Sequence, residues 1–309
     1  MNLERKFVYM KNGKSLIFLA LFVFLLMLPS CSTVPLTGRR QLNLVSDSEI
    51  NQTSAAQYRQ FVRSATQSGN SRYVDQVTRV GKRIAAATDI YLRQNGMADL
   101  ASAMQWEFNT IESEQVNAFC MPGGKIVVYT GLLQLVGSDD ELAAVVGHEV
   151  SHAVAKHSNE RISQEMLRQL GGQIIGVAAS KQSQLLQAVV GQAYGLGSQL
   201  LVALPYSRKQ EYEADKMGQV FMTISGYDPQ AAISFWRKMA RSGQGGQNWE
   251  ILSTHPSDVN RIKALEEFLP QARQYAPSAK KGGDKSMKKG HNKIGGKRRP
   301  ARTSQKWRF

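Results

Sequence analysis

The sequence predicts a mostly helical α+β domain with one small sheet, and two observations carry this prediction. Long segments between residues 46 and 273 place apolar residues at helical spacing, and several begin at a residue that caps a helix. Only two short segments read as strands: residues 104–113 alternate, and residues 123–130 form a β-branched run after a Gly-Gly turn. The sheet is therefore expected to be small and antiparallel or mixed.

The expected helices begin and end at recognisable residues. Ser46 and Ser138 each precede a glutamate three residues on, which is the capping-box pattern. Asp228 and Ser257 start two more helices, and Gly226 ends another. The expected helices cover 46 to the mid-60s, 71–88, 138–170 as one long helix, 207–226, 228–242 and 257–273. Residues 171–204 are interrupted by Gly and Gln, which favours packed or lid-like helices over a membrane span.

The net charge of +15 lies at the two ends of the chain. Residues 1–30 carry four basic side chains against Glu4, and residues 278–309 carry twelve against Asp284, so the body is nearly neutral. The only aromatic residues of the tail are Trp307 and Phe309, which argues against specific binding of nucleic acid. Residues 276–309 are expected to form a disordered basic tail, either simply solvated or attracted to anionic lipid or polymer.

Residues 1–30 are expected to be a signal peptide. A basic start, from Met1 or Met10, precedes an apolar run of 14 residues that begins at a serine, "SLIFLALFVFLLML", a length that suits a signal core better than a membrane span. The run ends in "LPSC", which resembles a bacterial lipoprotein signal apart from its Pro29. Cys31 is therefore the expected lipidated N-terminus, with an ordinary secretory signal as the alternative. Ser32 resembles the following residue of lipoproteins that are sent to an outer membrane.

Two further expectations concern the segment after the signal. Residues 32–46 are expected to form an extended tether. Cys120 is the only other cysteine, so acylation of Cys31 would leave it without a disulfide partner, and it is expected to be a small buried residue.

The stretch "HEVSH", residues 148–152, indicates a metal site. Residues four apart on a helix are separated by 40° beyond a full turn, so His148 and His152 project from one face and can bind one ion. Glu149 lies at the edge of that face, where it can reach a water molecule at the metal. This is the HExxH pattern of zinc peptidases, with Zn²⁺ as cofactor and Glu149 as general base. The alternative is a chance pair of surface histidines, which the apolar neighbours disfavour because burying unpaired imidazoles is costly.

A third ligand is expected from "EYEAD", residues 211–215. Glu211 and Asp215 face one way on their helix, so Glu211 can complete a His₂Glu zinc set and Asp215 can accept the ring N–H of a ligand histidine. Without the HExxH, a solvated acidic patch would be the better interpretation. Glu213 is expected to point outward. His157 lies half a turn away from His148 on the expected helix and is therefore predicted to be a surface or second-layer residue, not a ligand.

Four motifs carry a family resemblance: "NAFCMPGGKIVVYTGLL", "HEVSHAVAKHS", "SRKQEYEADKMG" and "THPSDVNRI". In this order they resemble the M48-type zinc metallopeptidases, the group of the CAAX prenyl protease, HtpX and Oma1. The resemblance covers roughly residues 35–270, and "TGRRQL" after the cysteine is similar to bacterial lipoprotein members. It implies a zincin-type (gluzincin) fold built around the HExxH helix. It also implies that His148, His152 and Glu211 bind one zinc ion, with Glu149 as base and Asp215 behind the ligands.

Two pairs of residues are expected to line the site. His255 could hydrogen-bond the oxyanion or approach and close the open zinc position, and Arg261 could hold Asp215 or Glu211; a capping histidine and a surface arginine are the alternatives. Asn117 and Ala118, with the strand at 125–130, could form a cleft edge that binds a peptide as an added strand. An ordinary hairpin explains these last residues equally well.

The sequence thus predicts a signal peptide at 1–30, a peptidase domain at 31–275 and a tail at 276–309. The expected function is a zinc metalloendopeptidase, lipid-anchored in the bacterial envelope, in the outer membrane and facing the periplasm. The expected substrates are misfolded or unassembled envelope proteins. The alternative is a chaperone or assembly factor whose zinc site is capped by His255.

Overall fold

The fold comes from a computed structural model that describes residues 31–170, 184, 186–188, 206–244, 249–255 and 259–277. Several predictions fall outside these residues: the signal peptide, most of the lid-like segment 171–204, the cap at Ser257 and the basic tail. Among the described residues, helices predominate and the strands are short, which confirms the predicted fold class. None of the helices in these ranges has both the length and the apolar character that crossing a membrane requires.

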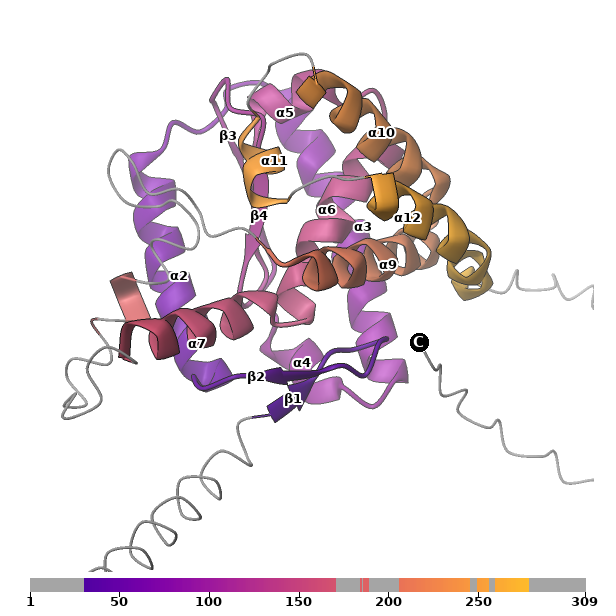
Figure 1. Ribbon diagram of the computed structural model, residues 1–309. Coiled ribbons are helices and arrows are strands. Elements are labelled where there is room, and N and C mark those ends of the chain that lie inside the picture. The colour runs from indigo at the N-terminus through magenta and orange to yellow at the C-terminus, as the bar shows by residue number, and fades with distance from the viewer. Residues whose placement is uncertain are drawn as a thin grey trace, which may run out of the picture.

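Two central helices, α6 (Asp139–Val154) and α9 (Arg208–Ser225), pack against each other. They are surrounded by α3 (Ser71–Gln94), α10 (Gln230–Gln244) and α12 (Val259–Ala272), as Figure 1 shows. Other helical elements are shorter or lie further out, among them α2 (Asp47–Ser64), α4 (Ala98–Ala103), α5 (Thr130–Leu135), α11 (Glu250–Thr254) and the 3₁₀ turn η2 (Arg273–Tyr275). The core is therefore built around α6, whose residues from Leu142 to Val154 are all buried.

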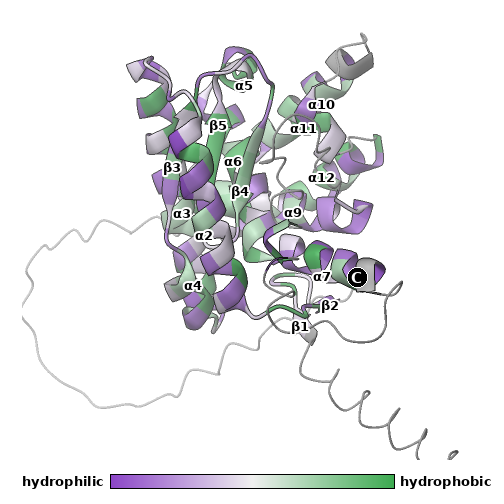
Figure 2. Ribbon diagram, turned by 90° about the vertical axis from the view of Figure 1, so that its left-hand side faces the viewer, coloured by the Kyte–Doolittle hydropathy of each residue, from purple (hydrophilic) through white to green (hydrophobic). Residues whose placement is uncertain are grey.

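The main sheet has three strands in the order β3-β5-β4, so β4 forms one of its edges. β3 (Glu107–Ile111) runs parallel to β5 (Lys125–Tyr129), and β4 (Ala118–Met121) runs antiparallel to it. The sheet is mixed, as expected. Figure 2 shows hydrophobic residues along β4, β5 and α6, and hydrophilic residues on the outer helices such as α2. The sheet thus packs its strands against the central helix and positions an edge strand beside it.

The expected helix signals hold where the structure describes them. The Ser138 hydroxyl accepts a hydrogen bond from the backbone N–H of Glu141 at 3.2 Å, and Ser46 caps α2 in the same way. Ser207 and Gln210 form a complete capping box at the start of α9. Gly226 ends α9 with a left-handed φ of 79°, a conformation in which glycine has no side-chain clash.

Helices α6 and α9 approach closely because each presents a glycine to the other. A Cβ placed on Gly218 would lie 3.1 Å from the backbone nitrogen of His148, and one on Gly147 would lie 3.3 Å from the carbonyl oxygen of Gly218. Helix axes come this near only where small residues meet at the crossing point. The contact fixes the distance between the HExxH helix and the helix that carries Glu211.

The prediction of one long helix over 138–170 is wrong. Helix α6 ends at Val154, and α7 (His157–Leu170) begins after Lys156, which adopts a left-handed φ of 57°. No glycine or proline marks this break, so periodicity alone could not reveal it. The turn changes the direction of the chain just past the HExxH motif. His157 is therefore not on the continuation of the α6 axis.

The prediction of an extended tether after Cys31 is also wrong. Strands β1 (Cys31–Thr33) and β2 (Arg40–Leu42) form an antiparallel pair that packs against α7, at the bottom of Figure 1. Val34 is buried, and the side-chain amide of Gln41 donates to the carbonyl oxygen of Ala155 at 2.7 Å. The segment "TGRRQL" therefore belongs to the folded body, because its polar side chains find partners there.

The glycine contact leads to a prediction for Gly218→Ala. The added methyl group would press on the α6 backbone at His148, so we expect the free energy of unfolding to fall by about 1–3 kcal/mol, even though alanine favours helix. Chemical denaturation measures this change. Gly69→Ala is the control, since a Cβ there meets nothing within 4 Å. Equal effects of the two substitutions would show that the helix crossing is not tightly packed.

Candidate metal centre

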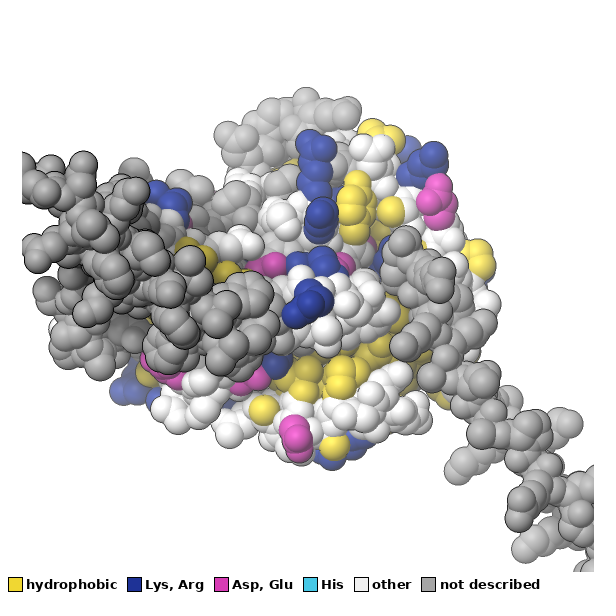
Figure 3. Space-filling view, turned by 60° about the horizontal axis from the view of Figure 1, so that its bottom comes forward, with side chains coloured by type: hydrophobic (Ala, Val, Ile, Leu, Met, Phe, Trp, Pro, Cys, Tyr) yellow, Lys and Arg dark blue, Asp and Glu magenta, His cyan; other side chains and the backbone are white. Residues whose placement is uncertain are grey.

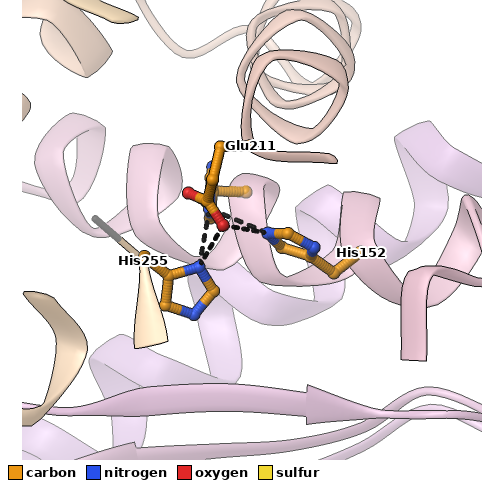
Figure 4. A group of neighbouring side chains, drawn as sticks. His152, Glu211 and His255 are labelled. Atoms are coloured by element: carbon orange, nitrogen blue, oxygen red, sulfur yellow. Dashed lines mark hydrogen bonds and ion pairs between the residues drawn. The ribbon is translucent and has the colours of Figure 1, made fainter. Parts of the chain in front are cut away.

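Four side chains from three parts of the chain converge on one point. His148 and His152 come from α6, Glu211 comes from the first turn of α9, and His255 follows α11. One donor atom from each lies within 4.8 Å of all the others, and all four residues are buried. Figure 4 shows His152 and His255 pointing toward Glu211. The structure thus brings together the three expected metal ligands and adds His255 to them.

The spacing of these donor atoms suits a zinc ion. Ligands at about 2.0–2.1 Å from a tetrahedral zinc lie about 3.3–3.4 Å from one another. Nε2 of His148 lies 3.4 Å from Oε2 of Glu211, and Nε2 of His152 lies 3.4 Å from Oε1 of Glu211. The two Nε2 atoms are 3.0 Å apart, and Nδ1 of His255 lies 3.2 Å from Nε2 of His148. These separations of 3.0–3.4 Å lie close to the tetrahedral spacing, and imidazole nitrogens and carboxylate oxygens are donors that zinc takes, so the residues fit the metal.

Asp215 and Arg261 hold the first histidine in place. The Nδ1 of His148 lies 2.9 Å from Oδ1 of Asp215, so a neutral ring carries its proton there and turns the Nε2 lone pair to the other donors. Arg261 donates from Nε and Nη2 to Asp215 at 2.9 and 2.8 Å, and its Nη1 lies 2.7 Å from Glu211. The predicted alternative of a surface arginine is wrong, because Arg261 is buried.

The buried site carries an excess of negative charge. Among the described residues, Glu149, Glu211 and Asp215 bring three buried carboxylates to the site and Arg261 brings one guanidinium, so the carboxylates outnumber the cation when the imidazoles are neutral. Burial alone lowers the pKa of His148, but Asp215 and Glu211 outweigh it and raise that pKa to about 9. A divalent cation would balance this charge, which is a second reason why the donor set fits zinc.

Glu149 lies beside the donor group without belonging to it. Its Oε1 is 3.4 Å from Nε2 of His255 and makes no hydrogen bond within the described residues. Burial raises the pKa of Glu149 above its ordinary value. The neighbouring strand β4 comes near as well, since burial and the Glu149 carboxylate together raise the pKa of Cys120. The thiol of Cys120 is free and buried, as expected.

Asn117 and Ala118, predicted at the cleft edge, lie at the start of β4. Ala118 is buried, and the carbonyl oxygen of Asn117 accepts from the N–H of Tyr129 at 3.1 Å. β4 pairs only with β5 among the described strands and packs along α6. The structure therefore places Ala118 at the start of this edge strand and Asn117 just before it, next to the HExxH helix, and neither is among the donors.

The structure contradicts the expectation for Glu213 and decides between the two alternatives for His157. Glu213 was expected to point outward but is buried, and Nε2 of His157 lies 3.0 Å from its Oε2. His157 is also buried, which excludes the surface alternative, and its Nδ1 lies 3.0 Å from Nδ1 of His152. The break between α6 and α7 turns His157 back toward His152, which makes it the second-layer residue of the two predicted alternatives, outside the donor group.

Aromatic neighbours of the site were not found in the sequence. Tyr206 stacks on His152 with ring centroids 3.8 Å apart, and the Arg161 guanidinium covers the other side of the Tyr206 ring at 3.7 Å. Trp236 lies edge-on to His148 at 5.1 Å and under Arg261 at 4.5 Å. No spacing rule connects these residues to the HExxH motif, so only the fold reveals that they fix its imidazoles.

The sequence profile of peptidase family M48 matches residues 75–269. The mitochondrial metalloendopeptidase OMA1 of Schizosaccharomyces pombe is 35% identical over 251 residues, which cover 77% of this chain and 66% of that protein. The beta-barrel assembly-enhancing protease of Yersinia pestis is 32% identical over 56% of this chain and 35% of its own length. The metalloprotease LoiP of Escherichia coli is 26% identical over 60% of this chain and 73% of its own length. The chain spans less than two thirds of the OMA1 proteins and of the assembly-enhancing protease.

The bond between Asp215 and His148 leads to a prediction for Asp215→Asn. The amide would place an N–H group against Arg261 and weaken the hold on the His148 tautomer, so we expect zinc affinity to fall about 10–100-fold. Competition with a chromophoric chelator measures the affinity.

Asp139→Asn is the matched control, because Asp139 also pairs with an arginine, Arg79 at 2.9 Å, but at the surface. Its zinc affinity should stay at the wild-type value. An unchanged affinity in Asp215→Asn would show that this carboxylate does not orient the ligand.

Proposed function

The chain belongs to peptidase family M48, and we propose on that premise that it is a zinc metalloendopeptidase with His148, His152 and Glu211 as zinc ligands. The observation that carries the proposal is that these three side chains meet, although Glu211 follows His152 by 59 residues in the sequence. Glu149 lies beside them and outside the donor group. Zinc bound there would polarise a scissile carbonyl and lower the pKa of a water molecule.

In this proposal the residues of the chain divide the work of hydrolysis. Glu149 takes the proton of the attacking water and delivers it to the leaving amine. Asp215 and Arg261 keep His148 oriented, and Tyr206 fixes the plane of the His152 ring. The β4 edge at Asn117 and Ala118 binds the substrate backbone as an added strand, which favours extended or unfolded segments over particular side chains.

A second candidate function rests on the position of His255. Its Nδ1 lies 3.0 Å from Oε1 of Glu211 and belongs to the four-donor group, and sites with four protein donors are typical of structural zinc. An M48 domain with His255 on the metal would act mainly as a chaperone or assembly factor. The endopeptidase is the better supported function, because a structural site has no use for the carboxylate of Glu149.

We further propose that the chain works in the bacterial envelope on misfolded or unassembled proteins, anchored through a lipid on Cys31. The lipoprotein-like signal supports the anchor, and the name of the Yersinia pestis relative supports an envelope role, whereas the OMA1 relatives are mitochondrial. Because β1 begins at Cys31, an anchor there would bring the hairpin side of the molecule to an outer membrane, facing the periplasm. Figure 3 shows exposed hydrophobic side chains on this lower side. The basic tail would add attraction to anionic lipid.

Glu149→Gln tests the enzyme proposal. We expect proteolysis of an unfolded substrate such as casein to fall at least about 100-fold, since the amide cannot act as a general base, while bound zinc stays stoichiometric. Fluorogenic peptide cleavage and metal analysis measure the two quantities. Glu267→Gln is the control, as Glu267 is exposed on α12. If Glu149→Gln restores the phenotype of a deletion strain as well as wild type does, the chaperone function is correct.

Cys31→Ser tests the anchor. We expect the wild-type chain to take up labelled palmitate and to fractionate with outer membrane, and the variant to be unlabelled and released in soluble form. Cys120→Ser is the control, because its thiol is buried and should not change fractionation. A Cys31→Ser protein that remains in the outer membrane without label would exclude lipidation as the anchor.

A further inference from the structure

A chain of buried polar side chains runs from His152 away from the donor group. Nδ1 of His152 lies 3.0 Å from Nδ1 of His157, and Nε2 of His157 lies 3.0 Å from Oε2 of Glu213. Arg39 donates from its Nε to both oxygens of Glu213 at 2.9 and 3.0 Å, and the hydroxyl of Thr37 donates to Oε1 at 2.9 Å. His152 and His157 are completely shielded from solvent, and Glu213 is nearly so.

The Glu213 carboxylate sets the direction of every proton in this chain. An ionised carboxylate only accepts hydrogen bonds, so Nε2 of a neutral His157 must carry the proton that faces it. Nδ1 of His157 then has a lone pair and can only accept. The Nδ1 of His152 must supply the proton between the two rings, which leaves its Nε2 free as a lone pair. This Nε2 is the atom that lies among the metal donors.

Arg39 pairs with Glu213 and holds it in place. Its guanidinium and the hydroxyl of Thr37 donate to the carboxylate on one side, and the His157 ring faces it on the other, which is the arrangement of an ion-paired acceptor. The other two nitrogens of Arg39 donate to Glu160 at 2.7 and 2.8 Å, so the guanidinium is held on both sides. Arg39 lies in the N-terminal hairpin and Glu213 lies in α9, so the folded structure brings together two segments that are far apart in the sequence.

We propose that His157, Glu213 and Arg39 act as positioning residues that hold the ligand His152 in the tautomer whose Nε2 is free to bind the metal. The inference rests on the proposed zinc site. His148 is oriented by Asp215 directly, whereas His152 is oriented by Glu213 through a second imidazole. The two ligand histidines of one helix therefore depend on two separate carboxylates of α9, at positions 213 and 215.

Glu213→Gln tests the proposal, because the amide group would reverse which ring nitrogens of His157 and His152 carry the protons. The amide oxygen would take the Oε1 place, where Thr37 and Arg39 donate, and the amide NH₂ would face His157. His157 would then donate to His152 and place the remaining proton on the metal-binding nitrogen. We expect zinc affinity, measured by chelator competition on the full chain, to fall about 10–100-fold.

Glu160→Gln is the matched control. It removes a buried carboxylate from the same arginine, but among the described residues Glu160 bonds Arg39 and Gln210 and makes no hydrogen bond to the His157 ring. We expect this variant to lose stability while its zinc affinity stays within about threefold of wild type. Equal losses of zinc affinity in the two variants would overturn the proposal, since the cluster would then act only through folding.

A spectroscopic measurement on the zinc-loaded wild type separates this proposal from the proposed activity. In protein labelled with ¹⁵N-histidine, we expect one imidazole proton covalently attached to Nδ1 of His152, with a scalar coupling across the hydrogen bond to Nδ1 of His157. Absence of this proton would refute the positioning chain even in an active peptidase. Its presence in a protein that binds zinc but cleaves nothing would refute only the proposed activity.

Discussion

The crossing of α6 and α9 at Gly147 and Gly218 is the contact on which the metal centre depends. It sets the separation between the two helices that carry His148, His152 and Glu211, so the donor atoms meet at distances that suit one ion. A larger side chain at the crossing would separate the helices by several tenths of an ångström. The metal site would be affected at once, because coordination tolerates errors of only about 0.2 Å. Close helix packing and metal binding are thus a single requirement in this fold.

The electrostatic balance of the centre follows from the same packing. The crossing buries Glu149, Glu211 and Asp215 together, and Arg261 compensates only one of their charges. Such an arrangement is stable only with bound protons or a cation, which explains why the pKa of His148 is raised despite the opposing effect of burial. His255 differs from the other donors because it follows a five-residue helix and does not lie on the central pair. Its place among the donors therefore depends on the segment after α11 and not on the α6–α9 crossing.

Local patterns in the sequence predicted much of this site. Helical spacing put His148 and His152 on one face and Glu211 and Asp215 on another, and caps located the helices that carry them. The errors concern tertiary contacts. No local signal marks the left-handed Lys156, so α6 and α7 were taken as one helix and His157 was placed on the side of it opposite His148. Glu213 was expected to point outward because its helix was assumed to have an exposed face, yet this helix is buried on most sides. The pairing of Arg39 with Glu213 spans 174 positions and could not be found from spacing.

The N-terminal hairpin shows how far the functional unit extends beyond the family match. The match begins at residue 75, but Arg39 and Gln41 bond to α9 and to the end of α6 from outside that range. Arg39 also bonds Glu160 in α7, so one guanidinium connects the hairpin to both α7 and α9. Because these contacts are buried and charged, removing the hairpin would leave Glu213 and Glu160 without their shared counter-ion. Buried carboxylates without a partner tend to take up a proton, and a protonated Glu213 no longer dictates which nitrogen of His157 carries hydrogen. The proximity of this hairpin to Cys31 therefore places the proposed membrane anchor only eight residues from the arginine on which the His152 tautomer depends.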